Sequence, residues 1–259
     1  MKIIKKSKSL NTKMNQKWLD SAGVKHFWMI WRFKFLLNLL KSQKIFCNKK
    51  MKIMDLGCGN GILSNQLENK FNVKIDRVDL NSETLKLNKN IKGKLICYNI
   101  KNKNIKLKNK YDIIFLFDVI EHVSNDKLFL KNTLFHLKND GFLIINVPSI
   151  QKLFSKYDHA VGHLRRYGKK DFLLLTNKIN LKILSMKYWG FSLLPILMIR
   201  KIILSFYKKT AYNKIVDRGW KTNTILNNFL KIIMYIELKL NKNSLIGSSL
   251  MIVLKNDII

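Results

Sequence analysis

Residues 52–61 read KIMDLGCGNG, and this stretch decides the fold. The apolar run ending at Leu56 predicts a short strand that carries the carboxylate of Asp55, and the following residues ILSNQL predict a helix. A strand, a glycine turn and a helix in this order bring backbone N–H groups of a helix N-terminus to a charged ligand. The spacing is D-x-G-x-G-x-G, and a G-x-G-x-x-G dinucleotide fingerprint would place its third glycine at Ile62, so that motif fits poorly.

The residues around this turn alternate between predicted strands and helices. Near-continuous apolar strands separated by helices indicate a parallel sheet covered on both faces. We therefore expect an α/β, Rossmann-like, seven-stranded and mostly parallel sheet, with an N-terminal helical cap and a helical insertion before the last strand. The predicted strands are 51–56, 73–80, 94–100, 111–120, 141–149, 181–191 and 245–256. The predicted helices are 62–70, 81–90, 124–141, 170–180 and 227–240, with a helix or helix pair in 18–40.

This pattern divides the chain into four segments. We expect a basic tail and cap helices in 1–45, a core in 46–191, an apolar helical insertion in 192–244 and the closing strand of the core in 245–259. The insertion begins with SLLPILMIRKIILSFY, in which Arg200 and Lys201 interrupt a strongly apolar run. Two interpretations stay open: burial in a membrane interface with these cations reaching water, or a helix that roofs a substrate pocket.

The chain is strongly basic, with 49 Lys and Arg against 16 Asp and Glu and a formal net charge of +33. The lysines are spread along the whole chain, so the charge does not outline a nucleic-acid patch; an anionic membrane or anionic substrate suits it equally well. Cys47, Cys58 and Cys97 show no C-x-x-C spacing, which predicts neither a disulfide framework nor a zinc site. The N-terminus lacks the apolar centre of a signal peptide, and no run predicts a membrane-spanning helix.

Polar residues follow three of the predicted strands, where a parallel sheet binds its ligands. Asp79 lies about 20 residues beyond the glycine turn and could accept both hydroxyls of a ribose, or only cap the next helix. Asn99 could pair with an adenine. Asp118, with Glu121 and His122 close behind, closes the fourth strand. One carboxylate beside one imidazole does not make a metal site, so we expect no metal.

These motifs together resemble class I S-adenosylmethionine (SAM) methyltransferases of the type 11/12 kind. The resemblance is carried by DLGCGNG, by Asp79 and by DVIEHV at 118–123, a segment similar to that of the ubiquinone-biosynthesis O-methyltransferases. The segment DHAVGHLRRYGKKDF at 158–172 resembles D-x-x-x-G-H-x-R-R-Y of a subgroup often encoded among sugar, capsule and lipid genes. KHFWMIWRFKFLL and IGSSLMIVLKN resemble that subgroup's N-terminal helix and closing strand, with Phe27 and Leu245-Ile246 as departures.

The resemblance implies SAM as the cofactor and a place for each of its parts. The methionine end is expected beside the glycine turn, the ribose at Asp79, and the sulfonium near Asp118 and Val119. The block from Asp158 to Tyr167 is expected over the substrate. The expected cofactor-binding residues are Asp55, Gly57, Cys58, Gly59, Gly61, Asp79, Leu80, Asn99, Asp118 and Val119.

Methyl transfer to a hydroxyl or amine also needs a group that removes a proton. His122, His159 and His163 are candidate bases because imidazole titrates near neutral pH, and Asp158 could orient one of them. Arg165 and Arg166, next to Tyr167, could grip an anionic group of the substrate, or could belong to a solvated turn.

We therefore expect a SAM-dependent methyltransferase acting on a small-molecule, glycan or lipid-linked acceptor at oxygen, in the cytoplasm or against the inner face of the membrane. The alternatives are an RNA methyltransferase and a non-catalytic membrane-surface protein on the same fold. No N-P-P-Y or D-P-P-Y tetrapeptide of base methylation follows the fourth strand, which counts against RNA.

Overall fold

The computed structural model describes residues 2–10, 23, 25–177, 179, 181–208, 214–216, 222–240 and 244–257. Within them, the strands form one sheet in the order β1-β4-β3-β2-β5-β6-β8-β7. All pairings are parallel except those of β8, which lies antiparallel between β6 and β7. The strands are β1 (Ile3–Lys5), β2 (Ile53–Leu56), β3 (Ile75–Asp79), β4 (Leu95–Cys97), β5 (Tyr111–Phe117), β6 (Leu137–Pro148), β7 (Leu181–Trp189) and β8 (Ser249–Asn256). The expected Rossmann-like architecture is confirmed.

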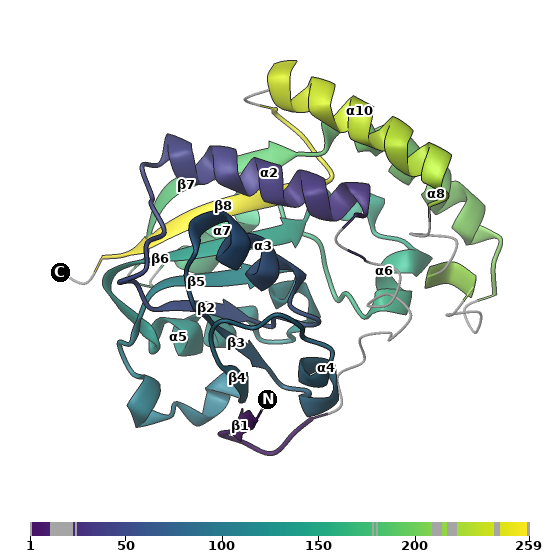
Figure 1. Cartoon of the computed structure of the whole chain (residues 1–259). Coiled ribbons are helices and arrows are strands. Elements are labelled where there is room, and N and C mark those ends of the chain that lie inside the picture. Colours follow the sequence, from purple (N-terminus) through teal and green to yellow (C-terminus); the bar gives the residue numbers. More distant parts are fainter. Residues whose placement is uncertain are drawn as a thin grey trace.

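Helices cover both faces of this sheet because alternate residues of its central strands are apolar and point to opposite sides. In β5, Phe115 belongs to the core under α2 and α3, and Leu116 to the core under α5 and α7. Figure 1 shows α2 lying across the sheet, with α10 beside it and α8 at the same end of the molecule. The helices are α2 (Phe27–Ser42), α3 (Ile62–Phe71), α4 (Ser82–Lys86), α5 (Asp126–Leu134), α6 (Lys156–Val161), α7 (Lys169–Thr176), α8 (Leu194–Ser205) and α10 (Thr224–Leu240).

The N-terminal residues contribute an edge strand that the sequence did not predict. We expected a loose basic tail, but β1 pairs in parallel with β4, from Ile3 beside Leu95 to Lys5 beside Cys97. A strand of three residues is too short to show a periodicity, and β4 supplies its hydrogen-bond partners along the open edge of the sheet. The sheet therefore has eight strands where seven were expected. The part of the expected 18–40 cap helix that falls before residue 23 lies outside the described residues.

The helix expected over 124–141 is shorter than predicted. α5 begins after Asn125, whose side chain accepts the Leu128 N–H at 3.0 Å, and not after Ser124. It ends at Leu134, because Leu137 already pairs with Tyr111 as the first residue of β6. Pairing with β5 and β8 outweighs the helical spacing of the leucines, and Gly141 lies inside the strand.

Candidate active site

The glycine turn has the backbone shape that only glycine adopts easily. Gly57, Gly59 and Gly61 all have positive φ, and a Cβ on Gly57 would collide with the side chain of Val119. The N–H of Gly59 donates to Asp79 Oδ2 at 3.0 Å, and Asp79 Oδ1 accepts the Asn81 N–H at 2.9 Å. The carboxylate of Asp79 therefore faces the turn, and burial raises the pKa of this group above its ordinary value.

A buried polar network supports the turn from behind, and sequence reasoning missed it. The Asn88 amide donates to the Gly59 carbonyl at 2.8 Å and accepts from Arg77 at 3.0 Å. Arg77 in turn donates to Glu68 Oε2 at 2.6 Å, and both side chains are buried. A buried charge needs such a partner. No sequence motif marks this pair, because its members lie on α3 and β3 and meet only in the fold.

A crevice runs from the turn to the end of β5. Its lining is Met29, Arg32, Asp55, Gly57, Cys58, Gly59, Asn60, Ile62, Leu63, Phe117 and Asp118. Gly61, the residue before α3, offers no side-chain cap, so the first N–H groups of α3 are open to a ligand at Ile62 and Leu63. Burial raises the pKa of Asp55 to about 6, and the carboxylate accepts from Ser64 at 2.6 Å. A helix start of this kind, with a buried arginine beside it, fits the carboxylate end of the expected SAM.

Asp118 is held in place by two side chains that the sequence analysis did not assign. Arg32 of α2 donates to Asp118 Oδ2 at 2.5 Å, and Asn146 of β6 donates to Oδ1 at 2.7 Å. Asp118 itself has a φ of 56°, a left-handed conformation that a non-glycine residue keeps only when its surroundings hold it. Asp118 lines the crevice together with the glycine turn, and the side chain of Val119 lies against Gly57. Arg32 could have been suspected from its place among aromatic residues, but its partner could not.

The N-terminal segment after β1 passes over the other end of this site. The N–H of Leu10 donates to the Leu80 carbonyl at 3.0 Å, and Ser7 Oγ accepts the Asn99 N–H at 2.9 Å. The Asn99 side chain accepts the Lys101 N–H at 3.0 Å. The residues expected around the adenosine thus lie under a strap formed by residues 6–10, and the Asn99 amide already caps a short helix.

A larger cavity of about 310 Å³ adjoins the crevice, and Asp118 lines both. One end of the cavity is polar, with Glu121, His122 and His163. The rest is mostly apolar and comes from α2, α6, α8, α10 and Leu193, the residue before α8; Arg200 of α8 is the cation among these residues. This lining includes Phe27, Trp28, Tyr157, Val161, Leu193, Ile196, Leu197, Ile199, Ile203, Leu204, Leu226 and Leu230.

His163 is the imidazole best arranged to take a proton in this cavity. Its Nδ1 lies 2.9 Å from Asp158 Oδ1. Burial alone would raise the pKa of Asp158, but the His163 hydrogen bond and the Arg166 charge hold it well below its usual range. An ionised carboxylate only accepts, so Nδ1 of His163 donates to Asp158, and Nε2 lies 3.8 Å from Glu121 Oε1.

Arg166 completes this arrangement by holding Asp158. Its Nε donates to Asp158 Oδ1 at 2.9 Å, and its Nη2 donates to Oδ2 at 3.0 Å. Its Nη1 donates to the Ser149 carbonyl at 3.2 Å. The arginine is buried and its donors are used within the protein, so the expected grip on an anionic substrate does not follow from this geometry. Asp158 and Arg166 position His163.

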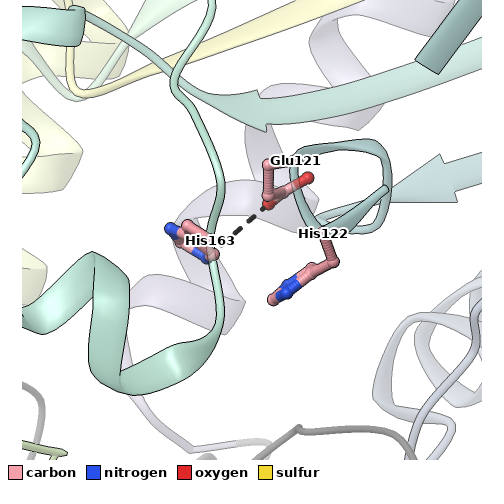
Figure 2. Close-up of side chains that lie close together, drawn as sticks. All are labelled: Glu121, His122 and His163. Atoms are coloured by element: carbon pink, nitrogen blue, oxygen red, sulfur yellow. Dashed lines mark ion pairs between the residues drawn. The ribbon is translucent and has the colours of Figure 1, made fainter. Parts of the chain in front are cut away.

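Figure 2 shows Glu121, His122 and His163 turned toward a common space. Each offers one ligand atom, and these atoms lie within 4.8 Å of one another, so three residues could hold a divalent cation. Burial and the nearby Asp118 raise the pKa of Glu121 well above its ordinary value. Burial and His163 lower the pKa of His122 to about 4, and its Nδ1 donates to the Gly162 carbonyl at 3.0 Å. Near neutral pH, His122 is therefore an uncharged, weak base.

Three other expected residues do not line the cavity. His159 is exposed and its ring packs edge-on against Phe154. Arg165 pairs with Asp126 Oδ2 at 2.7 Å, and Tyr167 is buried with its hydroxyl donating to the same oxygen at 3.1 Å. These contacts hold the loop after α6 against α5. None of the three residues expected to touch the substrate, His159, Arg165 and Tyr167, lines the cavity in this structure.

Comparison with known proteins places these features in a family. A family profile described as a methyltransferase domain matches residues 30–186. A ubiquinone biosynthesis O-methyltransferase of Pelagibacter ubique is 28% identical over 170 residues, which cover 61% of this chain and 70% of that protein. The enzyme of the same name from Rickettsia canadensis is 34% identical over 106 residues, covering 40% of this chain and 45% of that protein. The chain thus spans about half the length of the Rickettsia relatives it matches.

Solved structures agree with this fold. A sarcosine dimethylglycine methyltransferase from Galdieria sulphuraria, so described provisionally, superposes with a TM-score of 0.56 at 15% identity. The match covers 88% of this chain and 86% of that one. At this identity, the likeness extends to the fold alone.

Proposed function

This chain belongs to the methyltransferase domain family, and we propose that it transfers the methyl group of SAM to an oxygen of a small-molecule acceptor bound in the 310 Å³ cavity. One observation carries the proposal: the crevice with the glycine turn and the cavity with His163 meet at Asp118. A cofactor in the crevice and an acceptor in the cavity would therefore be neighbours. Holding the two reactants together supplies much of the acceleration in such a transfer.

The residues of the crevice fit the cofactor. SAM, when bound, supplies an activated methyl group on a positively charged sulfur. The open helix start at Ile62, with Arg32 nearby, suits its carboxylate, and Asp79 suits its ribose. Gly57 lets the backbone approach closely, since a side chain there would meet Val119. Asp118 brings negative charge to the point where crevice and cavity join.

We assign to His163 the removal of the acceptor's hydroxyl proton. The oxygen forms its bond to the methyl carbon, the O–H proton passes to His163 Nε2, and Asp158 stabilises the imidazolium through Nδ1–H. Burial favours the neutral form of Glu121, and in that form its carboxyl group would donate a hydrogen bond to the same oxygen.

The acceptor class that suits this cavity is amphipathic. Its polar end would lie at His163, and its remainder against the apolar lining from α8 and α10. Relatives of this chain are named for O-methylation in ubiquinone biosynthesis, which supports oxygen as the accepting atom and a small or lipid-linked molecule over RNA. We place the protein in the cytoplasm, with residues 192–207 in peripheral contact with the inner face of the membrane.

Two measurements test the proposal. Titration calorimetry should detect binding of SAM and S-adenosylhomocysteine, and absence of heat for both would remove the methyltransferase assignment. Transfer of labelled methyl from SAM to a panel of phenols should fall by about 10²–10⁴-fold in His163→Gln. The matched control, His122→Gln, should retain far more activity because His122 is the weaker base. If a chelator abolishes transfer and a divalent cation restores it, the three side chains of Figure 2 are metal ligands and the base assignment to His163 is wrong.

A further inference from the structure

The outer side of α10 carries an apolar stripe that no part of the described chain covers. Leu230 and Met234 are buried on its inner side, in the core shared with α2. On the outer side, exposed apolar residues recur every three or four positions, as on one face of a helix. They are Ile225 (81% exposed), Phe229 (55%), Ile232 (60%), Tyr235 (50%), Ile236 (49%) and Leu240 (81%).

α8 presents a second apolar face at the same end of the molecule (Figure 1). Only Leu204 of this helix is fully buried. The exposed residues are Ile196, Met198, Ile199, Ile202 and Ile203, followed by Phe206 at 83% exposure. Both helices border the same cavity, so their exposed apolar residues gather around it, and apolar surface gathered in this way marks an interaction site. We call the outer residues of α8 and α10, with Phe206, the apolar platform.

The cavity opens onto this platform. Ile196, Ile199, Ile203 and Leu226 line the cavity and are also 40–57% exposed. They come from both helices, so the mouth lies between α8 and α10. Leu193 and Leu230, which are buried, line the same cavity as His163. A molecule that enters here meets apolar side chains of both helices.

The charges around the platform favour an anionic surface as its partner. Lys201, Lys208 and Lys239 are exposed on or beside the two helices. Glu237 is the one acidic residue of α8 and α10, and it turns inward to accept the N–H groups of Gly190, Phe191 and Ser192. Exposed apolar residues flanked by lysines are typical of helices that lie in the interface of a membrane rich in anionic lipid. No helix in the described ranges is long and apolar enough to span a bilayer, so attachment would be to its surface.

We propose that the apolar platform docks on an anionic bilayer and that an acceptor with an apolar tail enters the cavity sideways, from the lipid, between α8 and α10. Sideways entry of the acceptor rests on the proposed function, whereas docking on the bilayer does not. Sideways entry explains why the mouth is apolar on both edges. A water-soluble acceptor would gain no free energy from contact with such a mouth, and the apolar side chains of the mouth would remain exposed to water at a cost in free energy.

Co-sedimentation of the full chain with vesicles tests the docking. Phosphatidylglycerol vesicles should bind the protein, less so at high salt, and phosphatidylcholine vesicles should bind it weakly. Phe229→Asp and Ile202→Asp should each lower the vesicle-bound fraction by about tenfold. The matched control is Leu174→Asp, which adds the same charge at a 72% exposed leucine of α7, away from the platform. An equal loss of vesicle binding in all three variants, or no loss in the two platform variants, overturns docking. Docking is also overturned if the parent protein binds no vesicles but forms a dimer that Phe229→Asp dissociates.

Photolabelling tests the entrance. Vesicles carrying phosphatidylglycerol with a diazirine in its tail should label the platform and also the buried cavity residues Leu193 and Leu230. Label confined to Met198, Ile202 and Phe229 would overturn sideways entry while leaving docking standing. Calorimetry with S-adenosylhomocysteine, without vesicles, separates sideways entry from the proposed function. If the protein binds the cofactor product but Leu193 and Leu230 are not labelled, sideways entry is wrong. If these residues are labelled but the cofactor product does not bind, the methyltransferase assignment is wrong.

Discussion

Replacing Asp158 by Asn should lower the free energy of unfolding far more than the same replacement of an exposed aspartate. The substitution keeps the size of the side chain and removes its charge, which leaves Arg166 buried, 6% exposed, without the anion it pairs with through two hydrogen bonds. Breaking a buried pair in this way costs about 3–5 kcal/mol. For a chain of this size, each kcal/mol lowers the melting temperature by about 2–4 °C, so we expect a fall of about 6–20 °C.

Differential scanning calorimetry measures this fall, and Asp171→Asn is the matched control. Asp171 is exposed and accepts only the Gly168 N–H, so its replacement should cost under about 1 kcal/mol. Adding Arg166→Met to Asp158→Asn should recover part of the loss, because the penalty is that of an unpaired buried cation. A melting temperature within about 2 °C of the parent would refute the buried pair as a source of stability.

The pH dependence of the same variant follows from the sign of the shift. The pKa of Asp158 is lower in the folded chain than in the unfolded chain, so its contribution is complete above an unfolded pKa of about 3.9 and is lost as the pH falls toward the folded pKa. We therefore expect the gap in melting temperature between the parent and Asp158→Asn to narrow as the pH falls below about 4. A gap that widens below that pH would contradict the lowered pKa.

The remaining predictions concern cofactor binding, measured as the dissociation constant of S-adenosylhomocysteine by calorimetry. Gly57→Ala should weaken binding at least about tenfold, because alanine strains a φ of 75° and meets Val119; adding Val119→Ala should restore part of it, and no restoration would exclude the collision. Arg32→Met should weaken binding by about tenfold through the loss of the charge that holds Asp118, and unchanged affinity would remove Arg32 from the site. Deleting residues 1–10 should weaken binding several-fold if the strap closes the adenosine end, and unchanged affinity would leave β1 a purely structural edge.

The core of this fold was predictable because its signals are local. The glycine turn, the apolar strands and the helix that begins at Ile62 can each be recognised within a window of about ten residues. The parallel packing of the strands then brings their ends together. For that reason the sequence could place Asp79 at the end of β3 and Asp118 directly after β5. The short strand β1 and the early end of α5 were missed because pairing with a distant strand decides them. Two isoleucines before a lysine, or a spacing of leucines, carry no information about the partner strand.

The sequence could not decide which histidine or arginine of the segment 158–167 lines the cavity. His159, His163, Arg165 and Arg166 lie within eight residues and have similar chemistry, yet only His163 and Arg166 reach the cavity. The difference comes from the turn at Gly162, which ends α6 with a φ of 89° and sends the chain back across Asp158. His159, still on the helix, points outward, and Arg165 faces α5, where Asp126 receives it.

Because of this turn, several residues of the segment 155–166 contact one carboxylate, that of Asp158. Asp158 caps its own helix through Ser155, orients His163 and neutralises Arg166, so one buried anion fixes the imidazole relative to the backbone. A base must keep its geometry within a fraction of an ångström to act, and a loop alone would not provide that. If this is the purpose of the network, Asp158→Asn should lower the rate of methyl transfer at temperatures well below its own melting point. An unchanged rate in the folded variant would mean that His163 is not the base.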